Sequence, residues 1–173
     1  RIDPYYRRVA QVHPDLEPPI CALIDSMATA PRKTLVLGDF SPKNILVHAR
    51  GLTLVDFETA HAGDPAFDLG FFLSHLVLKA FRAAPRPEPY LELTRRFWDA
   101  YRREAGDDPA LARRGTAHAA ACALARIDGT SPVDYRAELD PDAVRRAARA
   151  ALGAGPIDWD AFLQLSVREM HGT

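Results

Sequence analysis

Hydrophobic and polar positions divide this chain into one short β region and a series of helices. Apolar runs just before Asp39, at residues 45–47 and at residues 52–55 have the length of short strands. Elsewhere, apolar residues repeat at helical spacing, with proline and glycine at the breaks. The pattern predicts an α+β fold that is predominantly α-helical, with helices at residues 16–28, 65–82, 90–106, 109–127, 141–152 and 159–170.

Two of these expected helices should form most of the core. Asp64 can cap the helix at 65–82, and Pro65 suits its first position. Apolar residues fall all round this helix, so we expect it to be buried and central, but it is too short to span a membrane. The helix at 90–106 carries a stripe that we expect to pack inward, formed by Tyr90, Leu93, Phe97, Trp98 and Tyr101.

Composition and charge are those of an ordinary globular protein. With 47% hydrophobic residues the chain can bury one substantial core, so we expect residues 1–173 to form a single domain. A net charge of −1 provides no basic surface, so we expect neither nucleic acid nor a membrane as a partner. Cys21 and Cys122 are too isolated for a disulfide framework, and no signal peptide is recognisable, so we expect a cytoplasmic protein.

Side chains that can bind a metal ion lie beside the expected strands. Asp39 follows the first apolar run, Asn44 opens the second and Asp56 closes the third. Magnesium prefers hard oxygen ligands and is usually held by one or two protein oxygens together with substrate phosphates. Asp and Asn are also common turn residues, but their joint spacing here favours a site in which Asn44 and Asp56 bind Mg²⁺ and Asp39 orients a hydroxyl.

The motifs around these residues resemble those of a known group of enzymes. The sequences GDFSPKN at 38–44, VDFE at 55–58 and GDPAFDL at 63–69 resemble motifs of the small-molecule kinases with a protein-kinase-like fold. This group includes aminoglycoside phosphotransferases, choline kinases and methylthioribose kinases. The resemblance implies a phosphotransferase that uses ATP as phosphoryl donor, Mg²⁺ as cofactor and a small-molecule hydroxyl as acceptor.

The resemblance also implies roles for three residues of the first two motifs. Asp39 corresponds to the catalytic aspartate, and Asn44 and Asp56 correspond to the magnesium ligands. The chain departs from the family at Leu37, where the resembling proteins usually have a histidine that supports the catalytic loop.

Other polar residues have less specific roles. Ser41 and Lys43 are expected to bind the nucleotide phosphates, although Lys43 could equally be a solvated turn residue. Asp68 corresponds to a structural brace that holds the catalytic loop from the following helix. The polar turn at residues 126–131 could contact the acceptor or simply end a helix.

The resemblance covers the C-terminal, catalytic lobe of the kinase-like fold. No glycine-rich strand-turn-strand and no strand lysine precede Asp39, although both belong to the nucleotide lobe of kinases. We therefore expect this chain to be the catalytic and substrate lobe of a longer protein. Its missing N-terminal lobe would be its intramolecular partner, and the isolated lobe should be inactive.

Two other functions fit parts of the sequence. A catalytically silent kinase-like binding module would fit Leu37 and the missing lobe, but not the intact set of Asp39, Asn44 and Asp56. A haloacid-dehalogenase-like phosphatase would fit the letters at 54–59, but such enzymes place their metal motifs on separate strands of a parallel sheet. The sequence lacks the repeated strand-helix pattern that builds such a sheet.

Overall fold

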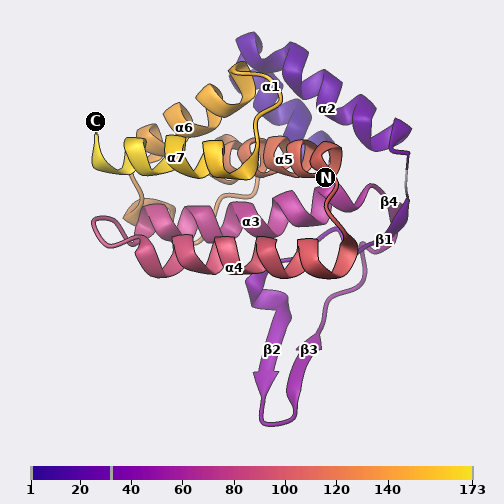
Figure 1. Ribbon diagram of the computed structural model, residues 1–173. Helices are drawn as coiled ribbons and strands as arrows, with labels where there is room; N and C mark the ends of the chain where they lie inside the picture. The colour runs from indigo at the N-terminus through magenta and orange to yellow at the C-terminus, as the bar shows by residue number, and fades with distance from the viewer. Residues whose placement is uncertain (1, 32, 173) are drawn as a thin grey trace.

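The computed structural model describes residues 2–31 and 33–172, which form a helical body with two small β-sheets (Figure 1). The helices before the first strand are η1 (Ile2–Arg7), α1 (Arg8–Val12), η2 (Pro14–Leu16) and α2 (Glu17–Thr29). The strands and the short helix between them are β1 (Thr34–Val36), η3 (Pro42–Asn44), β2 (Ile45–His48), β3 (Gly51–Leu54) and β4 (His61–Gly63). The remaining helices are α3 (Pro65–Arg82), α4 (Glu88–Ala105), α5 (Pro109–Asp128), η4 (Arg136–Glu138), α6 (Pro141–Gly153) and α7 (Trp159–His171).

This arrangement confirms the expected α+β class with mainly helical content, and the expected helices agree closely with the observed ones. Among the described residues, no helix combines the length and the apolar character needed to cross a bilayer.

Both sheets are two-stranded and antiparallel. Strands β2 and β3 form a hairpin in which Ile45 pairs with Leu54 and His48 with Gly51. This hairpin extends away from the helical body (Figure 1). Strand β1 pairs with β4, a strand that the sequence did not predict because its three residues, His-Ala-Gly, have neither alternation nor β-branched side chains.

Helix α3 is the central helix, as its apolar pattern predicts. Its side chains are almost all buried, and it packs against α4 and α5. The Asp64 side chain accepts the N–H of Ala66, and Pro65 occupies the first turn, so the predicted cap is confirmed. Helices α3 and α5 pack closely at Gly70, where an added Cβ atom would clash with the Cβ of His118.

The expected inward stripe on α4 is only partly correct. Leu93 is 47% exposed, whereas Leu91 and Thr94 are the buried residues of this helix. The aromatic members of the stripe are partly buried against the core, namely Tyr90, Phe97, Trp98 and Tyr101. Helix α4 lies at the side of the body against α3 (Figure 1), so its buried face is narrow and excludes Leu93.

The sequence did not predict helical structure before residue 16. Tyr5, Tyr6 and Val9 are nevertheless buried, and they insert into the core beside α5. The hydroxyl of Tyr6 hydrogen-bonds Nδ1 of His118, and Tyr5 makes an edge contact with Phe71. This segment therefore forms part of the core even though it is too short for a clear helical period.

Candidate active site

The candidate catalytic residues flank the hairpin and do not lie on its strands. Asp39 lies in the loop after β1, and Asn44 ends η3 directly before β2. Asp56 follows β3 by two residues. The N–H of Val55 donates to the carbonyl of Asn44 at 3.0 Å, which extends the hairpin pairing to its open end. Because this end faces the loop of Asp39, residues distant in sequence meet there.

Asn44 joins the three candidate residues through its side-chain amide. Its Nδ2 donates to the main-chain carbonyl of Asp39 at 2.8 Å and lies 3.3 Å from Oδ2 of the same residue. The same nitrogen lies 3.4 Å from Oδ2 of Asp56. All these contacts use the amino group of Asn44, so its amide oxygen Oδ1 takes part in none of them. Oδ1 is the atom that a metal ion would take.

Asp56 has an unusual backbone conformation. Its φ is 68°, which lies in the left-handed region and makes it the one non-glycine residue with positive φ among those described. This conformation costs an L-residue roughly 1–2 kcal/mol, although Asp tolerates it better than most residues. Such strain is typical of functional sites, where the surrounding structure fixes an unfavourable conformation. The turn aims the carboxylate of Asp56 back towards Asn44.

Asp68 holds the start of the loop that carries Asp39. Its Oδ2 accepts the N–H of Leu37 at 2.6 Å, and its Oδ1 accepts the N–H of Gly38 at 3.0 Å. Burial raises the pKa of Asp68, and the two N–H groups act against that rise. The carbonyl of Leu37 also accepts the hydroxyl of Thr59 at 2.8 Å, so both backbone groups of Leu37 are bonded.

The two expected phosphate-binding residues differ in their surroundings. The Nζ of Lys43 lies 3.2 Å from Oδ2 of Asp39, and its side chain is 64% exposed, so it can reach a bound anion. Ser41 is fully buried, and its hydroxyl has no hydrogen-bond partner among the described residues. The expected contact of Ser41 with the nucleotide phosphates stays a prediction.

The donor set suits magnesium better than a transition metal. The described residues contain no cluster of three or more His, Cys, Asp or Glu side chains. The site instead offers one amide oxygen, from Asn44, and the carboxylates of Asp56 and Asp39. Hard oxygen ligands in this small number fit Mg²⁺ that is shared with substrate phosphates.

Two further features near the site were not expected from the sequence. His75, on α3, is buried, and its Nε2 has no partner among the described residues. Burial and the charge of Arg126 lower the pKa of His75 to about 3, with Asp39 opposing them. Phe40, next to Asp39, stacks on Phe72 of α3 with ring centroids 4.8 Å apart. No sequence signal marks His75, because it stands within the apolar run of α3.

The polar turn after α5 has a structural role. Arg126 donates to the carbonyl of Ser131 at 2.7 Å and so closes the turn. Asp128 accepts from Arg145 at 2.6 Å and contacts His13 at 2.9 Å. Burial works to raise the pKa of Asp128, but the hydrogen bonds from Arg145 and His13 hold it below its usual value. These contacts favour the helix-stop interpretation of the turn over an acceptor site.

The comparisons with known proteins define the class. The family model of the phosphotransferase enzyme family, APH, matches residues 5–106, which contain the complete candidate site. The chain therefore belongs to this phosphotransferase family, and the predicted resemblance to aminoglycoside phosphotransferase-like kinases is confirmed. A comparison with curated proteins found no match.

Proposed function

We propose that this chain is the catalytic lobe of a Mg²⁺-dependent kinase that transfers the γ-phosphate of ATP to a hydroxyl group of a small molecule. The observation that carries the proposal is the contact of one amide, that of Asn44, with the carboxylates of both Asp39 and Asp56. Phosphoryl transfer requires mainly positioning and charge neutralisation, and these three side chains can provide both. The proposed fold is the C-terminal lobe of the protein-kinase-like fold.

Each residue has a proposed role that follows from its position. Asp39 orients the attacking hydroxyl and accepts its proton. Asn44 and Asp56 would hold a magnesium ion, and the bound ion would supply charge neutralisation at the phosphates. Lys43 contacts a phosphate oxygen in place of its present contact with Asp39. Asp68 does not touch the substrate but keeps the loop of Asp39 in place through Leu37 and Gly38.

The exposed hairpin supports the proposal that a nucleotide lobe packs on this chain. Four of its apolar side chains are between 40% and 80% exposed, in the order Val47, Leu52, Leu46 and Leu54 from most to least. Exposed apolar surface of this kind usually marks an interaction site. Because the hairpin adjoins Asn44 and Asp56, a lobe bound there would cover the proposed ATP site. We therefore expect the chain alone not to bind ATP and Mg²⁺ at micromolar concentrations in calorimetry.

The alternative functions have less support. The described residues form no parallel sheet, which a haloacid-dehalogenase-like phosphatase requires. A silent binding module has no need for the strained backbone of Asp56 or for the contact of Asn44 with both carboxylates. No observation favours either alternative.

The proposal is tested by turnover of the full-length protein with ATP, Mg²⁺ and a panel of sugars, amino sugars and amino alcohols. Release of ADP with one acceptor class is expected, and Asp39→Asn should lower kcat by about 10²–10⁴-fold with little effect on nucleotide binding. Asp160→Asn, at an exposed acid on α7, is the matched control. Nucleotide binding without turnover across the panel would support the silent module, and full activity of Asp39→Asn would remove Asp39 from the mechanism.

A further inference from the structure

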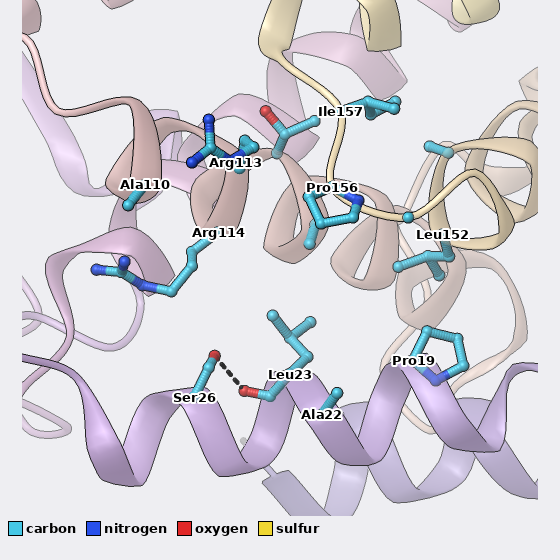
Figure 2. A pocket seen from close by; sticks show the side chains of 14 residues that line it. Pro19, Ala22, Leu23, Ser26, Ala110, Arg113, Arg114, Leu152, Pro156 and Ile157 are labelled. Atoms are coloured by element: carbon cyan, nitrogen blue, oxygen red, sulfur yellow. Dashed lines mark hydrogen bonds between the residues drawn. The ribbon is translucent and has the colours of Figure 1, made fainter.

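A cavity lies apart from the candidate active site. It has a volume of about 480 Å³ and lies between α2, α5, α6 and the segment that joins α6 to α7 (Figure 2). None of Asp39, Asn44, Asp56 and Asp68 lines it. Its volume falls within the range of about 300–1,000 Å³ that is typical of small-molecule sites. Most of its lining comes from residues 110–157, outside the part of the chain that the family model matches.

The walls of this cavity are apolar at one side and basic at the other. Figure 2 shows Pro19, Leu152 and Pro156 on one side, and Arg113 and Arg114 on the other. No acidic residue is among those that line the cavity. An occupant would therefore meet apolar surface and positive charge together.

The two arginines are not equivalent. Arg114 donates from Nε and Nη2 to the buried carboxylate of Asp64, at 2.7 and 3.1 Å. Its guanidinium group is therefore engaged in a structural ion pair. Arg113 is exposed, and within residues 2–31 and 33–172 it forms no ion pair. A guanidinium group forms strong hydrogen bonds with a carboxylate, sulfonate or phosphate. Arg113 is thus the group available for an anionic ligand.

We propose that this cavity binds a small amphiphilic anion, with an apolar body against Leu23, Ala117 and Leu152 and its single anionic group at Arg113. Burial of the apolar body supplies the binding free energy, and the guanidinium selects the charge. The proposal does not depend on kinase activity, because no residue of the candidate active site takes part.

A pair of fluorescent probes tests the two parts of the proposal separately. The first is 1-anilinonaphthalene-8-sulfonate, an apolar ring system with one negative charge. The second is N-phenyl-1-naphthylamine, which has the same rings without the charge. Titration of the whole chain should give saturable binding of both probes. Arg113→Glu should raise the Kd of the sulfonate about tenfold or more and leave that of the neutral probe within about twofold.

Two further variants complete the experiment. Ala22→Trp places a large side chain from the exposed face of α2 into the cavity and should weaken both probes. Arg103→Glu makes the same charge change on the exposed part of α4, away from the cavity, and should change neither Kd. Urea unfolding of each variant verifies that its fold is intact, and Ala110→Trp replaces Ala22→Trp if that variant does not fold.

Three results would contradict the proposal. Sulfonate binding that survives Ala22→Trp would locate the probe elsewhere, for instance on the exposed hairpin, and would overturn the proposal. Equal losses for Arg113→Glu and Arg103→Glu would show a general effect of net charge, which also overturns it. Equal weakening of the charged and neutral probes by Arg113→Glu would contradict the assignment of Arg113 as the anion contact.

Discussion

The carboxylate of Asp68 accepts the backbone N–H of Leu37 at 2.6 Å, and this contact holds the start of the loop that carries Asp39. In this chain the backbone of Leu37 is fixed from both sides, by Asp68 at its N–H and by Thr59 at its carbonyl. The loop that carries Asp39 is therefore held through main-chain groups, so the side chain at position 37 can be apolar.

Replacement of Asp68 tests this support. In Asp68→Asn only one side-chain atom remains an acceptor, so the N–H of Leu37 or of Gly38 loses its partner. We expect the free energy of unfolding to fall by about 1–3 kcal/mol. Amide hydrogen exchange at Leu37 and Gly38 should accelerate beyond that global change, because the loop opens locally.

The matched control is Asp25→Asn, at an exposed acid on α2 whose carboxylate is in no ion pair with a described residue. It should change the free energy of unfolding by less than about 0.5 kcal/mol. Unchanged exchange at Leu37 and Gly38 in Asp68→Asn would contradict the supporting role of Asp68.

Much of the fold could be predicted from the sequence because its helices have clear signals. The cap at Asp64 and the apolar circumference of α3 are local properties that the sequence displays directly. The strand β4 could not be predicted, since it exists only by pairing with β1. The burial of Tyr5 and Tyr6 likewise depends on a partner, α5, that lies more than a hundred residues later.

In the candidate site, too, some features could be predicted from the sequence and others depend on packing. The spacing of Asp39, Asn44 and Asp56 predicted that they would meet, because a short hairpin brings its two ends together. The left-handed backbone at Asp56 and the burial of Ser41 were not predictable, since both arise from packing around the loop. The exposed position of Leu93 was missed because periodicity shows which residues share a face but not how wide the covered face is.

The buried ion pair between Arg114 and Asp64 leads to a second prediction. The side chain of Asp64 is 0% exposed, and that of Arg114 is 19% exposed. Arg114→Met leaves a buried carboxylate without its cation, and we expect the free energy of unfolding to fall by about 3–5 kcal/mol. Adding Asp64→Asn, which removes the charge, should recover part of this loss. Urea unfolding measures both effects.

The control for this prediction is an ion pair at the surface. Arg96 contacts Glu92 at 2.7 Å, and the two side chains are 75% and 53% exposed. Arg96→Met should therefore cost less than about 1 kcal/mol. Similar costs for Arg114→Met and Arg96→Met would show that burial of Asp64 does not strengthen its dependence on Arg114.

The buried histidines predict how stability changes with pH. Burial lowers the pKa of His118 to about 3, against an ordinary value of 6.5, with Asp64 opposing and Arg114 adding to the shift. Between these two values the unfolded chain binds a proton that the folded chain excludes. The free energy of unfolding therefore falls as the pH drops from 6.5 towards 3, by up to about 1.4 kcal/mol per pH unit for this histidine.

The variant His118→Gln removes the proton that the unfolded chain binds at His118 and the folded chain does not. Urea unfolding at several pH values should show a slope reduced by nearly one proton between pH 6 and about 4. An unaltered slope in His118→Gln would mean that His118 can bind a proton in the folded protein.

The last prediction concerns the contact between α3 and α5 at two glycines. A Cβ atom at Gly70 would lie 2.5 Å from the carbonyl oxygen of Gly115 and 2.7 Å from the backbone nitrogen of Ala119. Backbone atoms cannot move aside as a flexible side chain can, so Gly70→Ala must separate the helices. We expect this substitution to lower the free energy of unfolding by about 3 kcal/mol.

Gly115→Ala is the matched substitution on the facing helix. A Cβ atom there would meet its nearest neighbours at 3.7 Å, which is ordinary contact, so no clash opposes the substitution. Alanine is the better helix former within α5, and Gly115→Ala should raise the free energy of unfolding by about 0.5–1 kcal/mol. Urea unfolding of the two variants should thus give changes of opposite sign. Equal destabilisation by both would show that glycine is needed throughout this contact and that the close approach is not confined to Gly70.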